Sequence, residues 1–514
     1  ATAFALSVVR PGSCGLGGGG FMVIWNAKTQ QAVTLDYRER APKQATRNMF
    51  VDKNNPAKTG NALSRKGHLA FAVPGTVAGL CYAQKQYGRL TLKTVLQPAI
   101  RLAKAGIHPD AHQRSLQKST LREFRNNPEH RKRFQALYEK YLNSGKEWKA
   151  DDRFHSPLLE VLEQIAERGS DGFYRGPVAR ALVAESRRGG GLLTPEDLAS
   201  MQPVVRKPMK GRFDSLEIIS MPPPSSGGVA LLESLNILSA YEREHPNQRI
   251  EKLGLNTPAY LHLLTEAMKH SFADRAAFLG DADFANVPVE RLIRRSYAER
   301  LAAKIDVNTT KPLKEYGRFL PVDDAGTSHF SIIDHQGNAV ACTETINTGF
   351  GSYVVEPKYG IVLNNQMDDF AAVPGQPNAF GLIQSEANSV QPGKKPLSSM
   401  TPTIVIKDGK AVFALGASGG PRIISSTLQV LLNMTRFGMS PAEAVNQPRI
   451  HHQWLPNTLF VEEPLFETVR KPLEQRKHSV ARRNNLAAVQ AVSRRQDGLR
   501  GASQPSKHGK PAGY

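Results

Sequence analysis

The sequence predicts an α+β fold, because helical and extended segments occupy separate stretches of the chain. Residues 90–316 are mostly helical, with helix-start signals at Thr91 and at Thr257-Pro258. Two strands joined by a polar turn are predicted in GTSHFSIIDHQGNAVACTETINT, residues 326–348. A strand, a glycine turn and a helix follow in residues 411–438. No regular βα alternation precedes them, which argues against a parallel doubly wound sheet.

The predicted hairpin brings two threonines together. Its strands flank a turn of Asp, Gly and Asn residues at 334–338. If Ile333 faces Ala339, Thr345 lies directly opposite Thr327, with Cβ atoms about 5 Å apart. Threonine pairs are also common in sheets that carry no chemistry, so the pairing alone leaves a purely structural role open.

A chain break before Thr327 would make this residue a nucleophile with its own base. The α-amine of a terminal threonine has an unperturbed pKa of about 7.7–8.0, so part of it is unprotonated near neutral pH. The free amine can accept the hydroxyl proton directly or through water. Gly326 is small and would leave space around the carbonyl of the broken bond.

The residues around Thr327 resemble the gamma-glutamyltransferase family of N-terminal nucleophile hydrolases. The family pattern T-[TS]-H-[FY]-S reads Thr-Ser-His-Phe-Ser at 327–331. The pattern D-x-x-G-N-A-V follows at 334–340, and the T-x-T-x-N-T run at 343–348. The likeness extends over nearly the whole chain. The chain break is implied by this resemblance and by no motif rule.

The resemblance implies a fold, a maturation step and an activity. We expect a four-layer αββα sandwich, with two stacked antiparallel sheets between helical layers. The precursor is expected to cut itself between Gly326 and Thr327 into a large subunit, 1–326, and a small subunit, 327–514. The two subunits should stay interlocked as one globular unit. The expected enzyme transfers the gamma-glutamyl group of glutathione or a related compound to water, amino acids or peptides, and needs no metal or organic cofactor.

Two motifs match the family residues that hold the donor α-carboxylate. LDYRERAP, residues 35–42, matches D-[FY]-R-E-x-A-P and places the carboxylate-binding arginine at Arg38. Arginine can grip a carboxylate through two parallel hydrogen bonds. PLSSMTPTIV places the family's serine pair at Ser398 and Ser399. Without the resemblance, these residues read as a surface arginine and a strand-entry turn.

A third motif, GIVLNNQMDDF at 360–370, reads as a buried strand that ends in polar groups. A carboxylate and amides at a strand mouth can hold an ammonium ion, and an Asn/Asp turn is an equal local alternative. The resemblance assigns the α-amine of the donor to Asn347, Gln366 and Asp369. It also places a lid over residues 371–395, where Phe380 stands at the position of a tyrosine in bacterial relatives.

The glycine turn supports two different mechanisms. In the family, backbone N–H groups at Gly419 and Gly420 form the oxyanion hole, and Thr345 orients or activates the nucleophile. The same turn satisfies G-x-S-x-G between a strand and a helix, as in the nucleophile elbow of an α/β-hydrolase. Ser418 would then be the nucleophile, with Asp497 and His508 following in the appropriate chain order.

A glycine run, GSCGLGGGG at 12–20, precedes the strand-like FMVIW. It formally satisfies G-x-G-x-x-G, but a dinucleotide site needs a strand before the run and a helix after it. The order here is reversed. We therefore expect these glycines to allow close packing of the backbone.

Composition limits the remaining classes of function. The chain has 514 residues, 40% hydrophobic and 22% charged, with a net charge of +21. This suits an ordinary globular protein, and no apolar run reaches the roughly 20 residues of a membrane span. The basic excess lies partly in residues 470–514 and is expected to be a solvated face, with no nucleic-acid partner. A non-enzymatic basic binding protein remains the alternative of a different class.

Other residue types give no competing site. Three cysteines, widely spaced at 14, 81 and 342, form neither a disulfide framework nor a zinc pattern. His108 and His112 are four residues apart but lack further ligands at metal spacing. The first residues, ATAFALSVVRP, start in mid-pattern without a signal peptide, so we expect an incomplete N-terminus. The resemblance implies a periplasmic or secreted protein.

Relatives with the same fold suggest a second acyl group. Some cleave glutaryl side chains of β-lactams, and others process poly-gamma-glutamate. The acidic Asp369 favours a donor that carries an α-amine, so gamma-glutamyl transfer ranks first.

Overall fold

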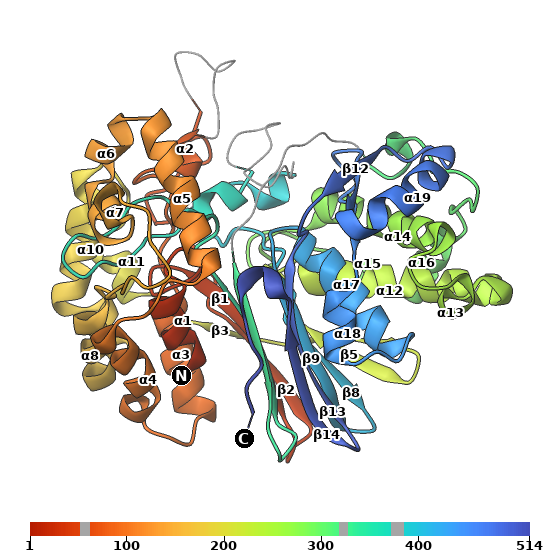
Figure 1. Ribbon diagram of the computed structural model, residues 1–514, viewed down its shortest axis with the longest axis horizontal. Helices are drawn as coiled ribbons and strands as arrows, with labels where there is room; N and C mark the ends of the chain where they lie inside the picture. Colours follow the sequence, from red (N-terminus) through yellow and green to blue (C-terminus); the bar gives the residue numbers. More distant parts are fainter. Residues whose placement is uncertain (52–61, 318–326, 372–384, 514) are drawn as a thin grey trace.

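The computed structural model describes residues 1–51, 62–317, 327–371 and 385–513. Its strands form two large antiparallel sheets (Figure 1). The first sheet has the order β3-β2-β1-β7-β6. Its strands are β1 (Gly19–Asn26), β2 (Gln31–Asp36), β3 (Val204–Arg206), β6 (Ser328–Ile333) and β7 (Ala339–Thr345).

The second large sheet has the order β14-β13-β9-β8-β5-β4. Its strands are β4 (Met209–Phe213), β5 (Leu216–Ser220), β8 (Thr403–Lys407), β9 (Lys410–Ser418), β13 (Ala488–Arg495) and β14 (Gly498–Ser503). A small third sheet contains β10 (Ile450–His451), β11 (Leu459–Glu462) and β12 (Val480–Arg483), the last two parallel.

Helices cover the outer face of each large sheet (Figure 1). Beside the first sheet lie α1 (Thr2–Val9), α2 (Ala62–Arg65), α3 (Thr76–Tyr87), α4 (Leu92–Ala105), α5 (Ala111–Asn126), α6 (Glu129–Arg133), α7 (Gln135–Lys140), α8 (Leu159–Arg168), α9 (Asp171–Tyr174), α10 (Gly176–Arg188) and α11 (Pro195–Ala199). Beside the second lie α12 (Gly227–Glu244), α13 (Ile250–Leu253), α14 (Pro258–Phe278), α15 (Val289–Leu292), α16 (Arg295–Ala302), α17 (Arg422–Thr435), α18 (Pro441–Asn446) and α19 (Glu463–Gln475).

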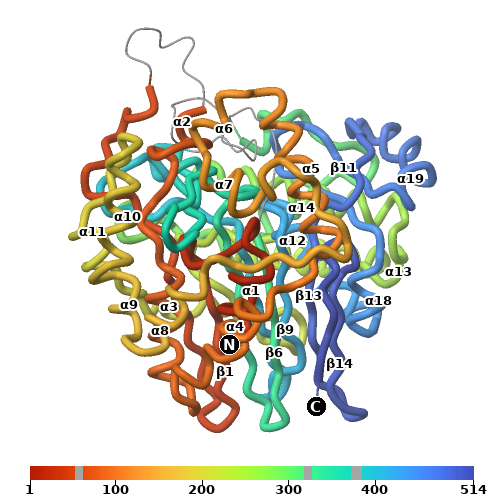
Figure 2. Tube along the Cα trace, turned by 60° about the vertical axis from the view of Figure 1, so that its left-hand side comes forward, coloured from red at the N-terminus to blue at the C-terminus, as the bar shows by residue number. Residues whose placement is uncertain are grey.

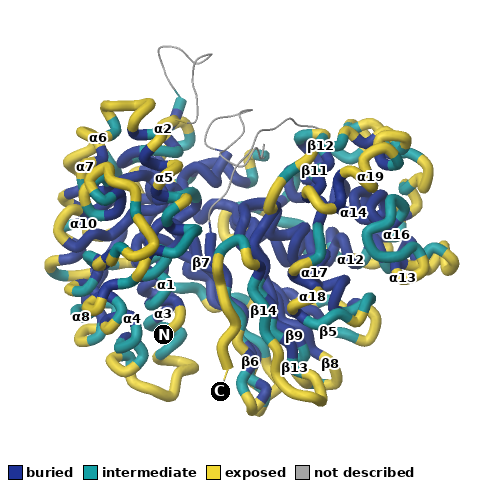
Figure 3. The backbone as a smooth tube through the Cα atoms, in the orientation of Figure 1, coloured by how far each residue is buried: buried dark blue, intermediate teal, exposed yellow. Residues whose placement is uncertain are grey.

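Three apolar cores show that these elements form four layers. One core joins the first sheet to its helices and another joins the second sheet to its helices. A third core lies between the sheets, where Val23 and Ala341 of the first meet Ile404 and Ala414 of the second. Strand β6 also packs against β9 and β13 of the opposite sheet (Figure 2). Burial is concentrated in the inner strands and helix faces, and the hairpin ends are exposed (Figure 3). The predicted αββα sandwich is confirmed.

The predicted register of the central hairpin is confirmed as well. Ile333 pairs with Ala339, and Ser328 pairs with Glu344. The turn closes because the Asp334 carboxylate accepts a hydrogen bond from the backbone N–H of Asn338 at 2.9 Å. The alternation of the strand places Cys342 in the core, fully buried.

The glycine run before β1 allows the backbone to pass close to the hairpin, as predicted. A Cβ atom at Gly18 would lie 2.1 Å from the carbonyl oxygen of Thr345, and one at Gly17 would lie 2.1 Å from that of Val362. A larger residue at Gly18 would displace the end of β7, and one at Gly17 would displace Val362. The close approach of Gly18 therefore helps to fix the position of Thr345.

Both helix-start predictions hold, with one difference at a helix end. The Thr91 hydroxyl accepts a hydrogen bond from the N–H of Thr94 at 3.2 Å, and Thr257 caps α14 in the same way. The sequence predicts that the helix capped by Thr91 runs to Ile107, but α4 ends at Ala105, because Gly106 leaves the helical conformation with φ of +72°.

Candidate active site

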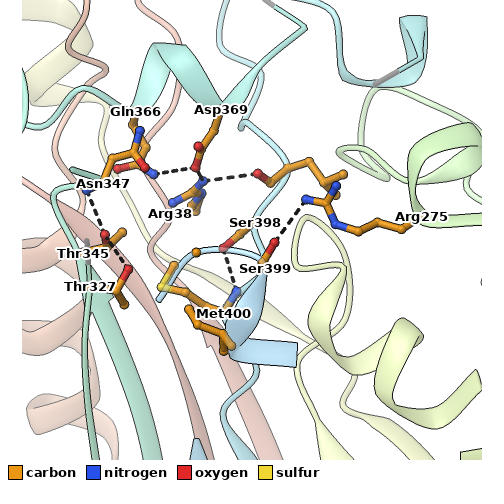
Figure 4. A pocket seen from close by; sticks show the side chains of 13 residues that line it. Arg38, Arg275, Thr327, Thr345, Asn347, Gln366, Asp369, Ser398, Ser399 and Met400 are labelled. Atoms are coloured by element: carbon orange, nitrogen blue, oxygen red, sulfur yellow. Dashed lines mark hydrogen bonds and ion pairs between the residues drawn. The ribbon is translucent and has the colours of Figure 1, made fainter. Parts of the chain in front are cut away.

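A pocket opens at the end of the central hairpin, beside the loops that carry Arg38, Asp369 and the serine pair (Figure 4). Thirteen residues line it: Arg38, Arg275, Thr327, Thr345, Asn347, Gln366, Asp369, Leu397, Ser398, Ser399, Met400, Gly420 and Ile423. Most of the residues selected from the sequence are thus brought together, although they come from distant parts of the chain.

The two threonines meet at the end of the hairpin. The Oγ1 atoms of Thr327 and Thr345 lie 3.1 Å apart, and both residues are buried. The Thr345 hydroxyl accepts a hydrogen bond from the backbone N–H of Asn347 at 2.8 Å. A hydroxyl that accepts one bond can still donate its own hydrogen, so Thr345 can donate to the Thr327 oxygen.

A charge pair lies across the pocket from the threonines. Arg38 follows β2, and its Nη2 donates to the Asp369 carboxylate at 2.5 Å. Gln366 donates to the same carboxylate oxygen at 2.8 Å, while its own side-chain oxygen has no partner in the described ranges. Burial raises the pKa of Asp369, and the neighbouring Arg38 opposes that rise. The pocket therefore offers a cation, an anion and a free amide acceptor.

The carboxyl group of Glu39 lies next to the Arg38 guanidinium. Glu39 lies 3.6 Å from the guanidinium and is fully buried. Burial raises the pKa of Glu39 to about 7, since Arg38 offsets only part of the desolvation. The Arg38 Nε also donates to the Pro396 carbonyl at 3.2 Å, which links it to the loop that carries the two serines.

The serine pair presents two hydroxyls to the pocket. The Ser398 oxygen accepts a hydrogen bond from the N–H of Met400 at 3.1 Å, and the Ser399 oxygen accepts one from Arg275 at 3.2 Å. Each hydroxyl keeps a hydrogen that it can donate to an anionic ligand.

The glycine turn lies between β9 and α17. Gly420 lines the pocket and has φ of +58°, a conformation that favours glycine. Gly419 precedes it in the chain and is not among the lining residues. Helix α17 begins at Arg422, so the turn lies at a helix N-terminus, where negative charge is stabilised.

The nucleophile-elbow alternative is wrong. Ser418 ends a strand of an antiparallel sheet, whereas the elbow requires a parallel α/β arrangement. Its hydroxyl contacts the Ala488 carbonyl at 3.5 Å. Asp497 lies exposed at the β13–β14 turn, where it pairs with Arg500.

Two predicted positions lie outside the described residues. They are the lid residue Phe380 and the cleavage-site residue Gly326.

Sequence reasoning missed two basic residues that contact the site. The Lys507 ammonium donates to the Thr327 carbonyl at 2.6 Å, and burial lowers the pKa of Lys507 to about 8. Arg275 reaches the pocket from α14. Neither residue lies in a local motif, so only the fold could reveal them.

A buried polar cluster in the second helical layer also escaped sequence reasoning. His262, Glu266 and His478 offer ligand atoms within 4.8 Å of one another. The facing nitrogens of the histidines are 2.7 Å apart and form a hydrogen bond. Glu266 accepts hydrogen bonds from Thr310 and Tyr316, and the Lys269 ammonium lies 3.5 Å away. These contacts engage both Glu266 oxygens and the facing nitrogens of the two histidines.

Comparison with known proteins assigns the family. The family model described as gamma-glutamyltranspeptidase matches residues 1–514. The chain belongs to the gamma-glutamyltranspeptidase family. Its relatives include the glutathione hydrolase proenzyme of Escherichia coli strain K12, 42% identical over 98% of this chain and 85% of that protein. The proenzyme of Pseudomonas sp. strain A14 is 38% identical over 100% of this chain and 86% of that protein.

Solved structures agree with this family and with the fold. A cephalosporin acylase from Bacillus halodurans has a TM-score of 0.84 and 25% identity, over 100% of this chain and 90% of that one. The Helicobacter pylori gamma-glutamyltranspeptidase has a TM-score of 0.54 and 38% identity, over 60% of this chain and 84% of that one. Proenzyme names among the gamma-glutamyltranspeptidase relatives fit two subunits made from one precursor.

No helix in the described ranges is both long and apolar enough to cross a membrane.

Proposed function

We propose that this chain is a self-processing gamma-glutamyltransferase that also hydrolyses glutathione. The observation that carries the proposal is the Thr327–Thr345 hydroxyl pair, 3.1 Å apart, facing the Arg38–Asp369 charge pair across one pocket. A gamma-glutamyl donor carries an α-carboxylate and an α-ammonium at one end and the reacting carbonyl at the other. The pocket offers complementary groups to both ends.

Maturation is the first step. The Thr327 hydroxyl attacks the Gly326 carbonyl, and the peptide nitrogen takes a proton as the acyl group moves to oxygen. Water then hydrolyses the ester and leaves Thr327 with a free α-amine. The pieces 1–326 and 327–514 would be about 36 and 21 kDa, as shares of 56.4 kDa.

Acyl transfer follows with the same hydroxyl. Thr327 attacks the gamma-carbonyl of the donor, and its own amine accepts the hydroxyl proton. The N–H groups of Gly419 and Gly420 stabilise the oxyanion. The leaving amine departs with that proton and leaves a gamma-glutamyl ester on Thr327. Water or the amine of an acceptor then attacks this ester and regenerates the hydroxyl.

The ends of the donor are held by complementary charges. Arg38, Ser398 and Ser399 bind the α-carboxylate. Asp369, Gln366 and Asn347 bind the α-ammonium, and the unpaired side-chain oxygen of Gln366 is one acceptor for it. Binding replaces the internal Arg38–Asp369 contact by contacts of each residue with the donor.

Two anilide substrates test the substrate class. Wild-type protein should release nitroaniline from gamma-glutamyl-p-nitroanilide far faster than from the glutaryl analogue, which lacks the α-amine. Thr327→Ala should abolish release, whereas Ser418→Ala should retain it. Preference for the glutaryl substrate would instead support the second candidate, an acylase, which the similarity to the Bacillus halodurans enzyme favours.

We also propose that the enzyme is periplasmic or secreted, and the family resemblance alone supports this location.

A further inference from the structure

Ser398 and Ser399 lie in a loop that is hydrogen-bonded to Ser225 and Ser226. The backbone N–H of Ser226 donates to the Ser398 carbonyl at 2.7 Å, and the Ser226 hydroxyl donates to the same oxygen at 2.6 Å. The Ser225 hydroxyl donates to the Met400 carbonyl at 2.5 Å. These hydrogen bonds show that the segment SMPPPSSGG, residues 220–228, holds the loop of the serine pair in place.

Arg275 forms hydrogen bonds with both this segment and the serine pair. Arg275 lies on α14 with 1% of its surface exposed. Its Nε donates to the Ser226 hydroxyl at 2.8 Å, and its Nη2 donates to the Ser399 hydroxyl at 3.2 Å (Figure 4). Its Nη1 is buried and has no hydrogen-bond partner among the described residues.

Within the part of the chain that the structure describes, no carboxylate contacts Arg275 to balance its charge. Asp369 acts on it through space, but the carboxylate of Asp369 already accepts hydrogen bonds from Arg38 and Gln366. Burial lowers the pKa of Arg275 to about 10, so the group stays cationic at neutral pH. A buried charge without a paired counterion is costly, and an anion bound nearby reduces that cost.

The direction of the hydrogen bonds gives the arginine a specific effect. A guanidinium only donates, so the Ser399 oxygen must accept and its own hydrogen is directed elsewhere. Arg275 therefore orients the Ser399 hydroxyl so that it acts as a donor. The positive charge of the guanidinium strengthens the hydrogen bond from this hydroxyl to an anion.

We propose that Arg275 is a positioning residue for the carboxylate of the donor, acting through Ser399 and Ser226. The inference rests on the proposed function, because it assigns Arg275 to the carboxylate end of the same donor. Arg275 then selects ligands that carry a carboxylate at this end and leaves the reacting threonine untouched.

Competitive inhibitors that differ by one group test this selectivity. L-Glutamine carries both α-groups, glutaramic acid carries only the carboxylate, and 4-aminobutanamide carries only the ammonium. Against gamma-glutamyl-p-nitroanilide, Arg275→Met should raise the inhibition constants of the first two about 10- to 100-fold. The constant of 4-aminobutanamide should change by less than about threefold. The KM of the anilide should rise with the first two, while kcat changes little.

Two further variants separate positioning from a general loss of structure. Arg275→Lys keeps the charge and should give inhibition constants between those of wild type and Arg275→Met. Ser226→Ala removes one hydroxyl and should raise the inhibition constants of the carboxylate ligands alone. This variant provides the test if Arg275→Met fails to fold.

Equal changes for all three inhibitors, or none, would overturn the inference. Absence of gamma-glutamyl turnover in the wild-type protein would instead overturn the proposed function, so the two failures are distinguishable.

Discussion

The Thr345 hydroxyl is oriented by a single backbone contact. Because its oxygen accepts from the N–H of Asn347, its hydrogen is available to the Thr327 oxygen 3.1 Å away. A donor at this position favours loss of the nucleophile's proton as attack begins.

Replacing Thr345 by valine keeps the shape of the side chain and removes this donor. We expect kcat to fall about 10- to 100-fold with KM little changed, since the donor-binding groups are intact. Steady-state kinetics with the gamma-glutamyl anilide checks this. Thr345→Ser restores the hydroxyl and should recover most of the rate. Full activity of Thr345→Val would show that the pair is structural.

Lys507 places a positive charge beside the residue that carries the proposed base. Its ammonium contacts the Thr327 carbonyl at 2.6 Å, and it stays mostly protonated below its pKa of about 8. A nearby cation disfavours protonation of the α-amine and so lowers the pKa of that amine.

Lys507→Met should therefore raise the pKa of the α-amine. The acid limb of the kcat/KM profile, which reports the unprotonated amine, should move about one unit to higher pH. Lys510→Met removes an exposed lysine from the same tail and should leave the profile in place. Identical pH profiles for both variants would show that Lys507 does not lower the pKa of the α-amine.

The strand and loop elements explain which parts of the site could be predicted. Strand alternation and turn residues predicted that Thr345 faces Thr327, because a hairpin register depends on local sequence. Arg38, Asp369 and the serine pair were identified only through the family motifs, since their meeting depends on loops far apart in the chain. Arg275 reaches the pocket from the last turn of α14, and no local pattern distinguished it from a core residue.

The glycine run before β1 gives an element-level test. Gly18→Ala would place a Cβ atom 2.1 Å from the Thr345 carbonyl oxygen, so the end of β7 must shift. We expect the free energy of unfolding to fall by about 1–3 kcal/mol and self-cleavage to slow. Denaturant titration and a time course of precursor loss measure both.

Gly15→Ala is the matched control in the same run. Its Cβ atom would lie 3.9 Å from the nearest side-chain atom, in Ser7. Its free energy of unfolding should stay within about 0.5 kcal/mol of wild type. Equal losses for both glycines would show that the close approach does not position Thr345.

Both large sheets combine strands from either side of the Gly326–Thr327 bond. In the first sheet β1 pairs with β7, and in the second β5 pairs with β8. Breaking the chain at that bond would leave these strand pairs and the three cores in place. The pieces should therefore remain together until the whole molecule unfolds.

Buried histidines should make the whole molecule sensitive to acid. Burial lowers the pKa of His270 and of His329 to about 3, and that of His478 to about 2. Each is neutral when folded and takes up a proton near pH 6.5 when unfolded, so stability falls as the pH drops below that value. Glu39 and Glu344, with pKa values raised to about 7 and about 8, act in the opposite direction above pH 4.5.

The contribution of one histidine to this pH dependence can be measured separately by substituting it. His270→Phe should reduce the pH dependence of unfolding between pH 6 and 4 by about 1.4 kcal/mol per pH unit relative to wild type. Urea titrations at several pH values give this difference. Parallel stability curves for the two proteins would show that His270 is not the neutral group assigned here.

The central claim is that Thr327 becomes the first residue of a new chain. The most direct measurement is the mass and N-terminal sequence of each chain in the purified, active wild-type protein, beside Thr327→Ala. We expect two chains for wild type, the smaller starting Thr-Ser-His-Phe-Ser, and one uncut chain for the variant. Active wild-type protein with an intact Gly326–Thr327 bond would contradict it.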